Sequence, residues 1–140
     1  MVDFSFFWLP FVVVAVVNFF LSWLYYSPAG PFFKTWAKAV GMGPGRQMSE
    51  ADRKAMPRLM GGAAVATLLF SYGLQVVVHS VKAADFGTGA LVGLVVWLGF
   101  AVTHSLNTQF EGRKPVVLVI NNVLYLITYV VGGGVVAIWR

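Results

Sequence analysis

Four long runs without a charged residue constrain this chain more than any other feature. They cover residues 4–33, 59–81, 86–110 and 115–139. A helix needs about 20 residues to cross about 30 Å of hydrocarbon, so each run is long enough to span a bilayer. Backbone groups inside a bilayer must be hydrogen-bonded within the protein, and the runs lack the alternation of barrel strands. The sequence therefore predicts an all-α membrane protein with four transmembrane helices, at about residues 5–26, 59–81, 86–110 and 115–139.

The turns at residues 82–85 and 111–114 are short, which makes the last three helices neighbours of alternating direction and predicts an antiparallel bundle. With 140 residues, 59% of them hydrophobic, the chain has room for a single four-helix domain. The first run should remain as a helix, because the residues ahead of it include Asp3 and no lysine or arginine, unlike a cleaved signal peptide.

The connection at residues 31–58 is basic and starts with an amphipathic pattern. After Pro31, a short helix would carry Lys34 and Lys38 on one face. Its other face would carry Phe32, Phe33, Trp36, Ala37 and Val40. This pattern predicts a helix in the membrane interface, and a stop-transfer flank with belt aromatics and snorkelling lysines is the alternative. Further on, Ser49 and Asp52 have capping-box spacing, and Pro57 would suit the first turn of the second membrane helix.

The placement of basic residues predicts the orientation. Six of the ten lie between the first two runs, two lie in the turn 111–114, and only Lys82 and Arg140 lie on the opposite side. The positive-inside rule places loops 27–58 and 111–114 in the cytoplasm and both termini outside a bacterial cytoplasmic membrane. Topology and contact with anionic lipids then account for the net charge of +5. We expect membrane lipids, and no nucleic acid, as partners.

Three of the predicted helices carry polar side chains at a similar depth, which we call the polar layer. Its members are Asn18 and Ser22 in the first helix, His104 and Asn107 in the third, and Asn121 and Asn122 in the fourth. At 1.5 Å per residue they lie about 5 to 15 Å from the cytoplasmic boundary. They could hydrogen-bond between helices, or bind a solute, an ion or a lipid. His104 is either a hydrogen-bonded core histidine or a proton-handling one.

The third predicted helix carries a stripe with spacings of three and four residues. Its members are Gly89, Gly93, Trp97, Phe100, His104, Asn107 and Glu111. The second helix adds Tyr72, Gln75 and His79 at similar spacing. Glycines let another backbone approach closely. The predicted helix-packing positions are Gly89, Gly93, Gly132 and Gly133.

Aromatic residues cluster where the first helix ends. The predicted interfacial anchors are Trp23, Tyr25, Tyr26 and Trp36. Such rings suit the headgroup region, and Pro28 stops the helix there. The alternative is a lipid-headgroup or partner site formed by these rings with Lys34.

Catalysis and metal binding find little support. The chain has no cysteine, which excludes disulfides, thiolate metal sites and a cysteine nucleophile. No aspartate or glutamate lies inside a predicted span, so no carboxylate pair or histidine-orienting acid is available. His79 and His104 lie about 25 Å apart by helix rise, too far to share one metal ion. We expect no catalytic residue, no metal and no cofactor.

A family pattern runs through nearly the whole chain. It consists of Asn18, the stretch Trp23-Leu24-Tyr25-Tyr26-Ser27-Pro28, Phe32, Trp36, Gly93, Trp97-Leu98-Gly99-Phe100, Phe110-Glu111, Asn121 and Tyr125. The chain thereby resembles the bacterial integral membrane family catalogued as domain of unknown function 1761. The resemblance implies a small four-helix membrane protein and no particular activity. The long basic segment 41–58 departs from the family pattern.

These observations predict a non-enzymatic membrane protein that self-associates through its glycine-bearing helix faces, alone or as an accessory subunit. Four helices enclose little space, so several copies would be needed to build a larger interior. The alternative is a small-solute or proton-coupled permeation protein whose pathway runs over the polar layer.

Overall fold

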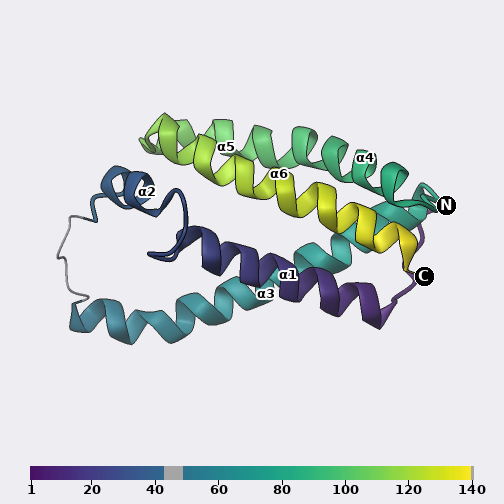
Figure 1. The fold of residues 1–140 in the computed structure, drawn as a ribbon, viewed down its shortest axis with the longest axis horizontal. Helices are drawn as coiled ribbons and strands as arrows, with labels where there is room; N and C mark the ends of the chain where they lie inside the picture. The colour runs from purple at the N-terminus through teal and green to yellow at the C-terminus, as the bar shows by residue number, and fades with distance from the viewer. Residues whose placement is uncertain (43–48, 140) are drawn as a thin grey trace.

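The computed structural model describes residues 1–42 and 49–139, and within them all regular structure is helical (Figure 1). Residues 43–48, which belong to the predicted basic loop, and Arg140 lie outside the described residues. Four helices are long and apolar enough to cross a membrane: Trp8–Tyr26, Glu50–Ser80, Phe86–Glu111 and Pro115–Ile138. The predicted all-α class and its four membrane-length helices are confirmed.

Prolines mark several ends of α1 (Trp8–Tyr26), α2 (Phe33–Ala39) and α6 (Pro115–Ile138). Pro115 is the first residue of α6, a position where the missing N–H costs nothing. Pro10 lies in the first turn of α1, so it helps to start this helix and does not kink it. The bend at Ser27 and Pro28 then separates α1 from the short α2.

α3 (Glu50–Ser80) is longer than its predicted membrane span. The predicted capping box is confirmed: the Ser49 hydroxyl accepts from the Asp52 N–H at 3.1 Å, and the Asp52 carboxylate accepts from the Ser49 N–H at 3.0 Å. The expectation that Pro57 lies in the first turn is wrong, because this cap starts the helix seven residues earlier. Pro57 is exposed, and the helix continues through it with one backbone hydrogen bond fewer.

The third membrane helix is interrupted. It consists of α4 (Phe86–Val96), a π-helical segment η1 (Trp97–Val102), α5 (Thr103–Asn107) and a 3-10 turn η2 (Thr108–Glu111). A π turn is wider than an α turn, so it rotates the residues that follow it. The buried positions are Gly89, Gly93, Ala101, Ser105 and Thr108. Of the predicted stripe, the positions beyond Trp97 are all exposed, namely Phe100, His104, Asn107 and Glu111. The expectation of one continuous stripe is therefore wrong beyond Trp97.

α6 lies at the centre of the fold and contacts α1, α2, α3, α4 and α5, most extensively α4. Both termini lie at one end of the molecule and α2 lies at the other (Figure 1). We call the first the terminal end, which also holds the turn 81–85. We call the second the loop end, which also holds the turn 112–114 and the start of α3.

Packing is uneven along the molecule. At the terminal end, a core cluster joins α1, α3 and α6 through Val14, Leu74, Val78, Ala83, Val136 and Ala137. At the loop end, Tyr25 packs on Ile120 and Leu124 of α6. The first half of α3 stays outside both clusters, since residues 57–66 are all exposed and the start of this helix lies well away from α6 (Figure 1). The chain therefore leaves the first half of α3 largely uncovered.

The four predicted packing glycines lie at contacts inside the chain. A Cβ added at Gly133 would lie 3.1 Å from the carbonyl carbon of Gly89 and 3.2 Å from the nitrogen of Gly93, and closer still to the Gly89 oxygen. A Cβ at Gly132 would meet Leu74 of α3 at 2.9 Å and Val14 of α1 at 3.3 Å. Glycine at these positions is what lets α4, α1 and α3 approach α6.

Asp85 caps α4, and this cap predicts a pH dependence. Its carboxylate accepts hydrogen bonds from the Thr88 hydroxyl at 2.6 Å and the Thr88 N–H at 2.9 Å, which lower the pKa of Asp85. A lowered native pKa contributes stability above the unfolded-chain pKa of about 4, and the contribution is lost as the pH falls through the native value. Asp85→Asn keeps a capping side chain that cannot titrate.

We therefore expect the unfolding temperature of Asp85→Asn in detergent to fall less steeply than that of the unmodified protein below about pH 4. Thermal unfolding of both proteins across this pH range measures the difference. Parallel curves would show that the Asp85 cap adds no pH-dependent stability.

Candidate functional site

The polar-layer residues all lie in the half of their helices nearer the loop end, but they do not form one cluster. One of them joins two helices: the Tyr26 hydroxyl of α1 donates to the Asn121 Oδ1 of α6 at 2.7 Å. Both residues are half-buried. This bond ties the end of α1 to the first third of α6.

Asn122 lies beside this pair and has a different environment. Its Nδ2 donates to the Leu118 carbonyl of its own helix at 2.9 Å, and its backbone carbonyl accepts from the Trp97 indole N–H at 3.0 Å. Its Oδ1 is buried and has no hydrogen-bond partner among the described residues. Asn122 thus anchors the start of the π segment to α6 and keeps one free buried acceptor.

The other members of the layer stand apart. His104 and Asn107 are exposed on α5, and Asn18 and Ser22 are half-buried on α1. Within residues 1–42 and 49–139, none of these four side chains makes a hydrogen bond. The structure therefore divides the six residues of the layer into Asn121 bonded to α1, Asn122 bonded within α6, two groups on α1, and two groups that face outward from α5.

Three of the four predicted anchors pack together at the loop end. The Tyr26 ring lies 5.1 Å from that of Trp36 and 5.7 Å from that of Tyr25, and Tyr25 lies 5.0 Å from Phe32. These rings fill the space between α1, α2 and α6, so they form a packed cluster and not an open cage. Trp23 points elsewhere and is 60% exposed.

A polar seam at the terminal end joins α3 to the first residues of the chain. Gln75 is fully buried, and its amide bonds both backbone groups of Phe7: Nε2 donates to the carbonyl at 2.8 Å and Oε1 accepts from the N–H at 3.2 Å. The Ser71 hydroxyl donates to the Phe11 carbonyl at 2.7 Å, and Ser80 Oγ accepts from the Asp3 N–H at 2.8 Å. The first N–H groups of a helix lack intrahelical partners, and α3 supplies one for α1.

His79 belongs to the same region. It is 4% exposed, its ring lies edge-on to that of Phe7 at 4.9 Å, and its Nε2 lies 3.4 Å from the Val136 carbonyl. Its Nδ1 is buried without a partner among the described residues. The spacing of Tyr72, Gln75 and His79 indicated a polar face on this helix. The spacing did not indicate what these side chains bind, because their partners are backbone groups, which every residue carries.

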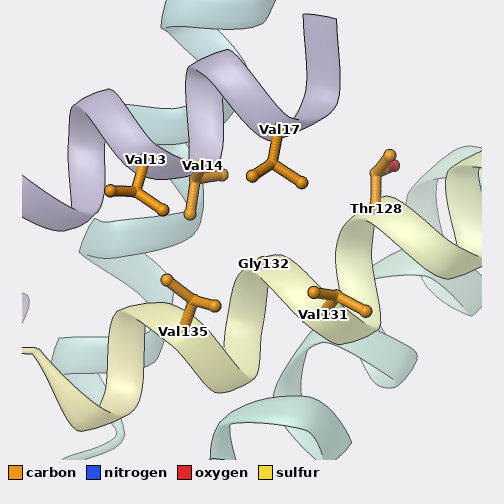
Figure 2. A pocket seen from close by; sticks show the side chains of 7 residues that line it. All are labelled: Val13, Val14, Val17, Thr128, Val131, Gly132 and Val135. Atoms are coloured by element: carbon orange, nitrogen blue, oxygen red, sulfur yellow. The ribbon is translucent and has the colours of Figure 1, made fainter. Parts of the chain in front are cut away.

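A shallow groove lies between α1 and α6, where their side chains face each other (Figure 2). Its lining is Val13, Val14, Val17, Thr128, Val131, Gly132 and Val135. Its volume of about 30 Å³ leaves room for only a small number of water molecules. The Thr128 hydroxyl is bonded to the Tyr125 carbonyl of its own helix at 3.1 Å, so the groove offers little to a polar solute.

The described part of the chain holds no group of three histidine, aspartate or glutamate side chains close enough to bind a metal ion. Four apolar membrane-length helices, joined mostly by short turns, define a small polytopic membrane protein. The family described as "Protein of unknown function (DUF1761)" matches residues 9–138, and the chain belongs to this family, which confirms the resemblance found in the sequence. No curated protein and no solved structure matches the chain.

Proposed function

We propose that the protein is a non-enzymatic integral membrane module that self-associates, alone or as an accessory subunit. The proposal rests on part of α3 that lies in the predicted membrane span and that no other helix of the chain contacts closely. Residues 59–66 of α3, which belong to the predicted membrane span, are exposed, and a Cβ added at Gly61 or Gly62 would meet nothing within 4 Å. Small residues of this kind favour close packing of a further helix.

The glycine-bearing faces of α4 and α6 are a poor surface for this association. Gly89, Gly93 and Gly133 are occupied by the packing of α4 on α6, and Gly132 by side chains of α1 and α3. A second copy would have to displace these contacts. We therefore assign self-association to the surfaces near the loop end that the chain leaves uncovered.

In the proposed topology, the four helices form an antiparallel bundle in a bacterial cytoplasmic membrane and α2 lies in the interface. The exposed Lys34 and Lys38 on α2 support this placement, because their amines are free to reach lipid headgroups while Trp36 and Ala37 pack on the protein. The basic loop end is cytoplasmic and both termini are outside. Thiol labelling of Thr88→Cys from outside intact cells tests this orientation, and labelling only after lysis would reverse it.

Native mass spectrometry from a mild detergent tests self-association directly. We expect a defined multiple of the 15.3 kDa chain. A bare monomer at every protein concentration would contradict the proposal. A fixed complex with a different protein would support the accessory role over the homo-oligomer.

Permeation of a small solute or of protons is the second candidate function. The outward-facing His104 and Asn107 favour it, since several copies could turn these groups toward a shared interior. The groove between α1 and α6 in a single chain is too small for this purpose. A proteoliposome flux that His104→Ala abolishes without unfolding the protein would favour permeation, and a flux equal to that of empty liposomes would exclude it for the solute tested.

A further inference from the structure

One side of the π segment and α5 faces away from the rest of the chain. We call it the α5 outer face and define it by Gly99, Thr103, His104 and Asn107, all exposed. The Thr103 hydroxyl donates to the Gly99 carbonyl at 2.7 Å, which fixes these two residues one above the other. The opposite side of the same segment holds the buried Ala101 and Ser105.

The α5 outer face is open to close approach. A Cβ added at Gly99 would meet nothing within 4 Å, in contrast to Gly93 one and a half turns earlier. Gly99, Thr103 and Asn107 follow one another at intervals of four residues, the spacing that lets two membrane helices approach. Small residues alone do not show that another helix binds here, but the polar side chains of His104 and Asn107 beside them need hydrogen-bond partners.

His104 and Asn107 are polar groups without partners at membrane depth. His104 lies about 10 Å from the end of the helix at Glu111, counted at 1.5 Å per residue. Neither side chain makes a hydrogen bond within the described residues. Lipid chains offer no donor or acceptor, and polar residues inside a membrane usually face protein or water. The π segment, which rotates both residues outward, therefore exposes groups that need another surface.

We propose that the α5 outer face binds the same face of a second copy of this chain. The inference rests on the proposed self-association and assigns it a contact surface in addition to the exposed stretch of α3. An asparagine amide and an imidazole each supply donors and acceptors, so two such faces can satisfy each other in a two-fold contact. Residues 99–107 include no aspartate, glutamate, lysine or arginine, so the contact brings no pair of such charges together.

Disulfide cross-linking of the full chain in proteoliposomes tests this contact. The chain has no native cysteine, so any disulfide in a single-cysteine variant must involve the introduced residue. We expect Thr103→Cys to form linked dimers under mild oxidation in at least about tenfold higher yield than Val123→Cys. Val123 is a matched control, because it is 38% exposed and, like Thr103, lies eight residues from its helix end at the loop end.

A matched pair of substitutions separates this contact from intrachain packing. Asn107→Leu removes this side chain from both copies, so it should weaken the dimer by at least about tenfold, the loss expected for one interhelical hydrogen bond, and leave the unfolding temperature of the monomer unchanged. Asn121→Leu, which removes the bond to Tyr26, should lower the unfolding temperature and leave the dimer intact.

The outcomes distinguish the inference from the proposed function. An oligomer that persists without a Thr103→Cys link and without an effect of Asn107→Leu would overturn the inference and leave self-association standing. A monomer in every assay would overturn both. A Thr103→Cys adduct with a different protein in native membranes, in place of the dimer, would overturn the second copy as the occupant.

Discussion

Gly93→Ala is expected to lower the free energy of unfolding by about 3 kcal/mol, the upper part of the usual cost of overpacking. A Cβ at this position would lie 2.7 Å from the carbonyl carbon of Tyr129 and would overlap its oxygen. These are backbone atoms of α6, so no flexible side chain can move aside. The two helices must separate, and the contact between Gly89 and Gly133 weakens with them.

Gly73→Ala is the matched control for this substitution. Gly73 is exposed on α3, and a Cβ there would meet nothing within 4 Å. Alanine is a better helix former than glycine by up to about 1 kcal/mol, so this variant should be neutral or more stable. Thermal unfolding in one detergent compares the two. Equal unfolding temperatures would mean that α4 and α6 do not pack through Gly93.

Gln75→Leu is expected to cost about 2 kcal/mol. The leucine keeps most of the volume of the buried side chain but removes both hydrogen bonds to Phe7. The Phe7 N–H then loses its partner, and unpaired buried backbone groups are costly. The first turn of α1 should fray, so hydrogen exchange at the amides of residues 3–11 should become faster.

Gln109→Leu provides the same chemical change at an exposed position in η2. It should leave both the unfolding temperature and the exchange of the first residues within error of the unmodified protein. If Gln75→Leu behaves like Gln109→Leu, the polar seam does not hold the terminal end together.

The two contacts both lie in the half of the molecule that holds the larger core cluster. Gly89 and Gly133 lie toward the terminal end, where the Gln75 seam and the larger core cluster also lie. The exposed part of α3 and the α5 outer face lie toward the loop end. Exposed apolar side chains such as Leu91 and Val95 also lie toward the terminal end, so what distinguishes the loop end is the exposed stretch of α3 and the unpartnered polar groups of α5.

The positions of the helices were predictable because a bilayer demands long uncharged segments. α6 ends at Ile138, one residue before the end of its predicted span, and α1 ends at Tyr26 as expected. α3 differs most, since it begins at Glu50 and not at residue 59. Charged residues end a membrane span but do not end a helix, and the capping box at Ser49 marked the true start.

The candidate site was less predictable, because the face of a helix depends on rotation accumulated residue by residue. Each α-helical residue turns the chain by about 100°, so the wider turn of η1 is enough to carry His104 and Asn107 from the predicted interior to the outside. The residue types at 97–102 do not predict a π turn. The bond between Tyr26 and Asn121 joins positions 95 residues apart, so no local pattern could predict it.

The sequence by itself determined the four apolar helices, the capping box at Ser49 and membership of the family, because hydrophobicity, capping and motif spacing are local properties. Only the tertiary structure decided that Gly93 meets the backbone of α6, that Gln75 bonds Phe7, and that α5 turns its polar side chains outward. Those outcomes depend on which helices meet and at what rotation, and the partners they involve are often backbone groups that every residue shares.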